Sequence, residues 1–496
     1  MLFNSVEFAI FLLIVYVFYV LTMRRLRAQN MMLLVASYVF YGWWDWRFLG
    51  LLLGSTVVDY ACARWIDRRV AQPESFDGAT APLRYTPAVR RRILLISILV
   101  NLGVLGVFKY YDFFADSLAE ALTALGVQAS PMTLGVLLPV GISFYTFQTL
   151  SYTIDVYRGD LPAHRGFVEF ALFVSFFPQL VAGPIVRATD LLPQITRPRT
   201  LSLQQTCDGG RLLFWGLFKK LVLADNLALV ADRIFEPGAT HHGGAVLVGV
   251  YAFALQIYCD FSGYTDMARG CSKLLGFELP LNFNLPYLAT NPVEFWRRWH
   301  ITLSTWLRDY LYIPLGGSRR GSRRTAINLM LTMILGGLWH GAAWTFVLWG
   351  VYQGALLVLY KSVQPWWTPI ARKLERRVGL AWRVACTIAF FQLVCLGWLV
   401  FRAESVGQVS SLLDRILSPW AYWWIVGAVG APSGTWGVAF AAVTLLCFQL
   451  SRRHAGEDVV LGGLPVPVRA ATYAAMFIVL AAFGVMIERP FVYFQF

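Results

Sequence analysis

The chain has 496 residues, of which 57% are hydrophobic and 14% are charged, with a formal net charge of +14 and a mean hydropathy of +0.57. A soluble domain carries about 25% charged residues, so this composition excludes an ordinary soluble protein and indicates a polytopic membrane protein. The positive charge does not indicate a nucleic-acid partner, because it lies in short basic clusters between apolar segments, which is typical of cytoplasmic loops.

Apolar segments that approach or reach the roughly 17–25 residues needed to span a bilayer recur along the chain, and we expect roughly eleven to thirteen transmembrane helices. Clear examples are residues 6–23, 93–107, 327–347 and 470–485. The first is followed, not preceded, by the basic residues Arg24, Arg25 and Arg27, which predicts a retained anchor with the N-terminus outside. No polar stretch is long enough to fold alone, so we expect a single all-α membrane domain over residues 1–496.

Two segments in the first half interrupt apolar sequence with glycine and proline. Residues 139–145 (PVGISFY) and the pair Gly183-Pro184 predict breaks in membrane helices, which are tolerated where they line a cavity. Further on, Lys219 and Lys220 are adjacent within apolar sequence, and we expect them to mark a membrane interface.

Residues 260–266 (DFSGYTD) bring polar side chains into an apolar stretch that starts near Val246. Ser262, Thr265 or Asp266 is expected to cap the helix that follows. For Asp260 two interpretations stay open. The carboxylate either has a structural partner or orients a histidine, as carboxylates do in many catalytic sites.

A helix is predicted to begin at Asn291, with Pro292 at its first position and Glu294 at its third, and to end near Pro314. One apolar stripe at the 3.6-residue period includes Trp296, Trp299, His300, Leu303, Trp306, Leu307, Tyr310 and Leu311. With its basic opposite face, this helix is expected to lie in the membrane interface. His300 on the apolar stripe either extends its nitrogen to the headgroup level or is a polar group of a reaction site.

His340 follows four small or apolar residues in the segment 336–341 (GGLWHG). On a continuous helix it lies about 24 Å from the basic cluster that ends at Arg324, which places it inside the bilayer. Gly336, Gly337 and Gly341 provide a surface that another helix can approach closely. His340 is either a general base that takes a proton from an attacking hydroxyl or a hydrogen-bonding group between helices.

Other classes of site are excluded by their missing motifs. The sequence has no phosphate-binding loop of the Walker type and no nucleophile elbow around a serine. The two histidines are not in an H-E-x-x-H arrangement, so no metal site is expected. We also expect no bound cofactor.

Five segments together resemble the membrane-bound O-acyltransferase (MBOAT) family, and within it the bacterial branch that contains alginate O-acetyltransferase. They are residues 141–147 (GISFYTF), 260–266 (DFSGYTD), 282–287 (NFNLPY), 294–310 (EFWRRWHITLSTWLRDY) and 336–342 (GGLWHGA). The resemblance covers nearly the whole chain, and the WRRWH and LWHG blocks are specific to the family.

The resemblance implies a ring of transmembrane helices around a central tunnel. It places the family's essential histidine at His340 and its second active-site histidine at His300. We expect Asp260, Trp299 and Trp339 to support these two residues. Arg297 and Arg298 are expected either to bind the phosphates of an acyl donor or to be ordinary positive charges of the cytoplasmic side.

The predicted function is membrane O-acyl transfer in the bacterial inner membrane. The resemblance implies that acetyl groups from a cytosolic donor, acetyl-CoA, pass across the membrane to an exported polysaccharide such as alginate. It also implies periplasmic partners of the SGNH-hydrolase type, with membrane lipid around the chain and no nucleic acid. Other acceptors within the family are cellulose, peptidoglycan and teichoic acid, which receives D-alanyl groups.

A polysaccharide exporter or a proton-coupled transporter is the competing class, with the histidines as proton relays. Transporters often contain internal repeats, and none is visible in this sequence.

Overall fold

The computed structural model describes residues 1–69, 83–418, 437–447, 461, 464–485 and 489–494. In these residues the regular structure is helical, and the only β pairing is an isolated bridge between Arg69 and Leu83. The all-α class predicted from the composition is therefore confirmed.

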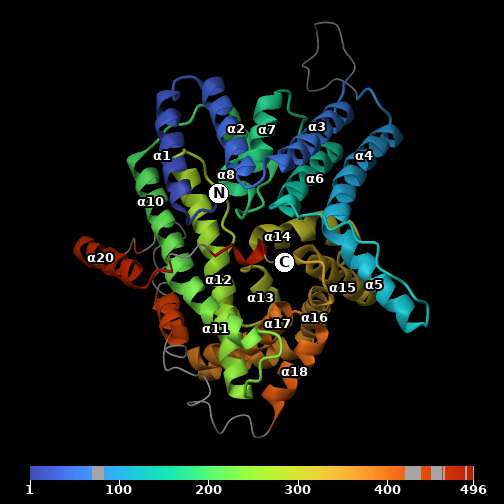
Figure 1. The fold of residues 1–496 in the computed structure, drawn as a ribbon, viewed down its shortest axis with the longest axis vertical. Helices are drawn as coiled ribbons and strands as arrows, with labels where there is room; N and C mark the ends of the chain where they lie inside the picture. The colour runs from blue at the N-terminus through green and yellow to red at the C-terminus, as the bar shows by residue number, and fades with distance from the viewer. Residues whose placement is uncertain (70–82, 419–436, 448–460, 462–463, 486–488, 495–496) are drawn as a thin grey trace. The chain divides into compact units, whose positions relative to one another are not determined.

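The chain divides into two compact units, and most of the α-helices are labelled in Figure 1. Unit 1 comprises Met1–Thr206 and Cys271–Pro280, and unit 2 comprises Cys207–Gly270 and Leu281–Phe496. The helices of unit 1 are α1 (Val6–Leu21), α2 (Leu26–Gly42), η1 (Trp46–Phe48), α3 (Leu49–Ile66), α4 (Pro87–Leu105), η2 (Gly106–Tyr110), α5 (Tyr111–Ala124), α6 (Ile142–Arg158), α7 (Phe167–Ser175), α8 (Phe177–Leu180) and α9 (Ala188–Thr196).

Two helices have residues in both units, α10 (Leu203–Phe218) and α12 (Gly243–Leu274). The remaining helices belong to unit 2: η3 (Lys219–Ala224), α11 (Asp225–Phe235), η4 (Pro286–Leu288), α13 (Pro292–Trp296), α14 (Ile301–Leu307), η5 (Arg308–Tyr312), α15 (Gly321–His340), α16 (Trp344–Val378), α17 (Leu380–Arg402), α18 (Val406–Leu417), α20 (Val466–Phe483) and η6 (Val492–Phe494).

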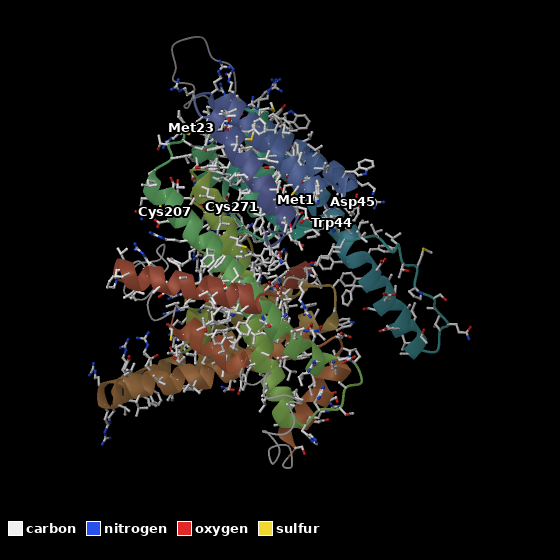
Figure 2. All side chains as sticks on the ribbon, turned by 60° about the vertical axis from the view of Figure 1, so that its left-hand side comes forward. Met1, Met23, Trp44, Asp45, Cys207 and Cys271 are labelled. Carbon is white, nitrogen blue, oxygen red and sulfur yellow. The ribbon has the colours of Figure 1, made fainter. Side chains whose placement is uncertain are left out.

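Within unit 1, α3 packs against α4 and α6, which also pack against each other (Figure 1). Buried Asp59 of α3 links the three helices, because its carboxylate accepts hydrogen bonds from Asn101 of α4 (2.9 Å) and Thr153 of α6 (3.2 Å). A carboxylate removed from water needs such donors. At the start of the same unit, α1 and α2 pack together, with Met1 and Met23 flanking α1 and Trp44 and Asp45 following α2 (Figure 2).

Both breaks predicted in unit 1 are present. α6 starts directly after Gly141, whose φ of 78° lies in the left-handed region. A Cβ atom at this position would lie 2.9 Å from the carbonyl oxygen of Leu180, so a side chain has neither the backbone conformation nor the space. α8 ends at Leu180, shortly before Gly183-Pro184.

Within unit 2, α15 packs along α16 (Figure 1). Their contact is backbone to backbone, since a Cβ atom on Gly337 would lie 2.2 Å from the carbonyl oxygen of Phe346. On the opposite helix, a Cβ atom on Gly350 would lie 2.5 Å from the carbonyl oxygen of Met333. The close approach expected at the glycines before His340 is therefore present, and α16 is the helix that makes it.

In the part of the chain that the structure describes, six helical segments are long and apolar enough to cross a membrane. They are Trp46–Ile66, Pro87–Ala124, Gly243–Leu274, Trp344–Val378, Leu380–Arg402 and Val466–Phe483. The larger number expected from the sequence also counted shorter apolar segments such as α1. In α12 83% of the apolar window is buried, against 6% in α20, so α12 is an interior helix and α20 presents an apolar surface.

Candidate active site

The helix predicted from Asn291 begins as expected but is shorter. The side chain of Asn291 accepts a hydrogen bond from the backbone N–H of Glu294 (2.9 Å), so it caps α13. α13 then ends at Trp296, and α14 starts only at Ile301. The prediction of one continuous helix to Pro314 is therefore wrong, and the break lies immediately before and at the first histidine.

His300 causes this break through its own backbone, which has a φ of 41°. The left-handed conformation costs a residue other than glycine about 1–3 kcal/mol, so the surroundings must hold it in place. The preceding loop does so. The N–H of Asn284 donates to the carbonyl of Arg298 (2.8 Å), and the N–H of Ile301 donates to the carbonyl of Asn282 (2.9 Å).

The side chain of Asn282 fixes the proton on the His300 ring. Its Oδ1 accepts from the backbone N–H of Thr302 (3.2 Å), which can only donate, so the atom that faces this turn is the oxygen. The same oxygen lies 3.1 Å from His300 Nδ1, which must therefore carry the hydrogen. His300 Nε2 is then a bare acceptor, and this buried atom has no hydrogen-bond partner among the described residues.

His300 is fully buried, and burial lowers its pKa to about 3. The ring is neutral at pH 7 and presents a lone pair rather than a charge. Of the two interpretations that the sequence left open, the burial contradicts a side chain that reaches the headgroup level.

His340 is the last residue of α15, and its side chain is buried. The backbone of Gly341 is extended, and a Cβ atom there would lie 2.1 Å from the ring of Phe346. The span predicted over residues 327–347 is therefore interrupted after His340, and α16 starts at Trp344. Both histidines thus lie where a helix ends or starts, where the backbone can aim a side chain independently of a helix face.

The structure brings the two histidines into one aromatic cluster of unit 2. Trp339 lies between them, with its ring centroid 6.1 Å from that of His300 and 5.1 Å from that of His340. A second path runs through Phe261, 4.7 Å from His300, and Tyr493, 4.6 Å from Phe261 and 5.3 Å from His340. Residues distant in sequence therefore surround the two polar rings.

The expected supporting residue Trp339 thus contacts both histidines. Trp299 is also buried but one layer further away. Its ring packs on Phe283 (5.0 Å) and Trp398 (4.8 Å), and Phe283 in turn lies 6.3 Å from His300. Trp299 therefore supports the wall of the cluster, while Trp339 forms part of its interior.

Asp260, the third expected supporting residue, does not pair with a histidine. Its carboxylate lies 2.9 Å from Lys220 Nζ and accepts a hydrogen bond from the backbone N–H of Val492 (2.7 Å). Lys220 also pairs with Asp225 (2.8 Å). The histidine-orienting interpretation of Asp260 is therefore wrong, and its structural partners come from η3 and the end of the chain.

The two lysines expected at an interface are buried instead. Lys219 Nζ lies 2.8 Å from both Ser262 Oγ and Asp266 Oδ2. The capping role predicted for Ser262, Thr265 or Asp266 is also wrong, because α12 continues through all three. Ser262 and Asp266 are thus partners of Lys219, whereas Thr265 donates back to the carbonyl of Phe261 (2.9 Å).

The arginines assigned to the donor differ in environment. Arg298 forms an ion pair with Glu294 (2.7 Å) on the same turn, whereas Arg297 is exposed.

Several residues of the cluster were not predicted from the sequence. The His340 ring also contacts Trp349 (5.2 Å) and Phe401 (5.5 Å), besides Tyr493. Phe261 lies in the motif at residues 260–266 but has no local signal of its own, and no sequence pattern indicates Tyr493. Only the tertiary structure brings these rings to the histidine, since α16, α17 and η6 supply them.

Comparison with known proteins agrees with this arrangement. Residues 161–398, which include both histidines, match the membrane-bound O-acyltransferase family. The chain is similar to the probable alginate O-acetylase AlgI of Azotobacter vinelandii, with 47% identity over 77% of this chain and 71% of the relative. It is 44% identical to that of Pseudomonas syringae pv. tomato, over 79% of this chain and 70% of the relative.

A more distant relative carries a different acceptor in its name. The peptidoglycan O-acetyltransferase of Helicobacter pylori is 35% identical over 78% of this chain and 73% of the relative. The identities, the coverage and the helical membrane fold lead to one conclusion. The chain belongs to the membrane-bound O-acyltransferase family and is a multi-pass membrane acyltransferase.

Proposed function

We propose that this protein passes acetyl groups across the membrane for the O-acetylation of an exported polysaccharide, and that alginate is the polymer that is acetylated. The observation that carries the proposal is a pair of buried histidines joined through Trp339 in a chain 44–47% identical to alginate O-acetylases. The acyl donor in this proposal is acetyl-CoA, which reaches the site from the cytosol. The acceptor side faces the periplasm, the membrane is the bacterial inner membrane and the N-terminus lies outside.

The chemistry assigned to His340 is general base catalysis. The acceptor hydroxyl attacks the carbonyl carbon of the thioester, and an imidazole nitrogen of His340 takes its proton. Collapse of the tetrahedral intermediate breaks the carbon–sulfur bond, and the leaving thiolate recovers that proton from His340. An ester forms, a thiol is released, and His340 returns to its starting state.

His300 is assigned a different task, because it is neutral and its Nε2 is a bare acceptor. A buried acceptor can orient a hydroxyl or amide group of a bound substrate. Arg297 is assigned to the phosphates of the donor, since its side chain is exposed. Delivery to the polymer is assigned to a periplasmic partner of the SGNH-hydrolase type.

The first test compares His340→Ala with wild type in a polysaccharide-producing cell that lacks its own copy of the gene. Ester-linked acetyl content of the polymer is measured at matched abundance of the membrane protein. Loss of a general base lowers such rates by about 10²–10⁴-fold, so we expect acetylation to fall below detection while the polymer yield stays constant.

The matched control is His242→Ala, because His242 is exposed in the segment between α11 and α12. This variant is expected to acetylate like wild type. Normal acetylation by His340→Ala would overturn the assignment of His340. A changed polymer yield with unchanged acetyl content per residue would instead favour the transporter class.

A further inference from the structure

The last described residues of the chain are attached to α12 next to the histidine cluster. Asp260 accepts the backbone N–H of Val492, and Lys220 holds the same carboxylate from its other side. Val492 and Phe491 are buried, and the Phe491 ring packs on Tyr264 (4.6 Å). A charged residue of an interior helix thus fixes the position of η6 through the main chain.

This attachment places Tyr493 against the proposed base. The Tyr493 ring lies 5.3 Å from that of His340, 4.6 Å from Phe261 and 6.3 Å from Phe401. Phe491 stacks on its other side at 5.3 Å. Tyr493 is therefore held on several sides and has little freedom to turn its hydroxyl elsewhere.

The Tyr493 hydroxyl is buried and has no hydrogen-bond partner among the described residues. Burial of a hydroxyl without a partner costs about 1–3 kcal/mol, so such a group calls for a reason. Every side chain that packs on its ring in the contacts above is aromatic, and phenylalanine in place of tyrosine would satisfy that packing at no such cost. The oxygen is therefore the part of this residue that packing does not explain.

We propose that the Tyr493 hydroxyl donates a hydrogen bond to the carbonyl oxygen of the acyl group while the acceptor attacks it. The inference rests on the proposed function. When the hydroxyl oxygen of the acceptor bonds to the carbonyl carbon, the carbonyl π electrons move to its oxygen, which becomes negatively charged. A fixed donor in a water-poor site stabilises that charge more in the transition state than in the bound substrate.

Tyrosine suits this task and not that of the base. Burial raises the pKa of Tyr493 above its ordinary value, so the phenol keeps its proton at neutral pH. His340 takes the proton from the acceptor, and Tyr493 supplies the donor that a neutral His300, with its bare Nε2, does not. Asp260 is then a positioning residue, which acts through Val492 and not through either histidine.

The test is Tyr493→Phe in the full-length protein, assayed in native membranes as release of CoA thiol from acetyl-CoA. Loss of one oxyanion donor lowers kcat by about 10²–10³-fold, and we expect a fall of that order with KM for acetyl-CoA unchanged. The melting temperature of the detergent-purified protein should be unchanged or higher, because the variant removes a buried unpaired hydroxyl.

The matched control is Tyr352→Phe, which removes a hydroxyl that donates to the carbonyl of Leu393 (2.7 Å) in the same unit. It should keep wild-type kcat. Wild-type kcat in Tyr493→Phe would overturn the proposal, as would a rise in KM alone or a loss of activity that parallels a loss of thermal stability. His340→Ala in the same assay separates the two hypotheses, because its full activity would contradict the proposed base whatever Tyr493→Phe does.

Discussion

A single neighbour, Asn282, determines several properties of His300. Asn282 accepts from the ring, from the N–H of Thr302 and from the Thr302 hydroxyl (2.9 Å), all through one oxygen. This arrangement determines the tautomer, stabilises the left-handed turn and leaves Nε2 as an acceptor without a partner among the described residues. It also makes the protonated ring unfavourable, because no carboxylate compensates the charge in the interactions that the structure gives for His300.

The depressed pKa makes the stability of the fold depend on pH. The unfolded chain binds a proton at His300 below its ordinary pKa of about 6.5, whereas the folded chain does so only near pH 3. Between these values the unfolded state holds more protons, so the free energy of unfolding falls as the pH falls, by up to about 1.4 kcal/mol per pH unit.

We expect His300→Asn to remove this contribution, since asparagine tolerates the left-handed conformation and does not titrate. Thermal unfolding of both proteins in detergent, from pH 7 to pH 4, measures it. The melting temperature of wild type should drop more steeply than that of the variant. Parallel curves would show that His300 is not a buried neutral histidine.

The helices of unit 2 position the site by where they stop. α15 ends at His340 and α16 starts at Trp344, and the close contact between the two helices depends on Gly337 and Gly350. Glycine lets the two backbones meet, so that Trp339 and His340 at the end of α15 reach the rings of α16 and α17. Separation of this helix pair would therefore move the proposed base.

Gly337→Ala tests that dependence with one added carbon. Its Cβ would lie 2.2 Å from the Phe346 carbonyl oxygen, so the helices must shift, at a cost of about 1–3 kcal/mol. Gly103→Ala on α4 is the control, because a Cβ there meets no atom within 4 Å. We expect lower thermal stability and lower acetylation for the first variant and wild-type values for the second. Equal behaviour of the two variants would contradict the tight contact.

In the interior of unit 2, buried lysines and aspartates form ion pairs. Lys219 pairs with Asp266, and Lys220 lies between Asp225 and Asp260. These side chains are almost fully buried, and ion pairs of this kind join η3 to α12 and, through Asp260, to the chain end. A buried charge that loses its partner is far more harmful than the pair is helpful.

This asymmetry predicts the outcome of a double-mutant cycle at Lys219 and Asp266. Lys219→Met alone should cost about 3–5 kcal/mol, since it removes the nearer cation from the buried carboxylate of Asp266 and leaves only Arg269, at 4.0 Å. Asp266→Leu alone should be similarly harmful, because it takes the carboxylate from Lys219. The double variant should recover part of the loss, because neither member of the closer pair is then buried without the other. Melting temperatures and membrane abundance report the result, and additive losses would argue against a coupled pair.

Short-range patterns in the sequence predicted the class of fold and the location of the two histidines. Composition and apolar segment length report the membrane, and the cap at Asn291 depends on neighbours within one turn. The glycine breaks at Gly141 and near His340 belong to the same kind of local signal. The family motifs at residues 294–310 and 336–342 likewise identified His300 and His340, with no information about the residues around them.

Such arguments could not predict which side chains these residues contact, because the contacts join segments far apart in the chain. A periodic stripe predicted one helix through His300, but long-range pairing with Asn282 and Asn284 holds a turn there instead. Lysines in apolar sequence suggested an interface, yet carboxylates one helix away pair with them inside the protein. Composition and helical periodicity thus determined by themselves that this is a helical membrane protein with two candidate histidines. Only the tertiary structure decided that Asp260 holds Val492 and that Tyr493 lies against His340. Contacts between segments so far apart in the chain, 232 residues for Asp260 and Val492, leave no local pattern in either segment.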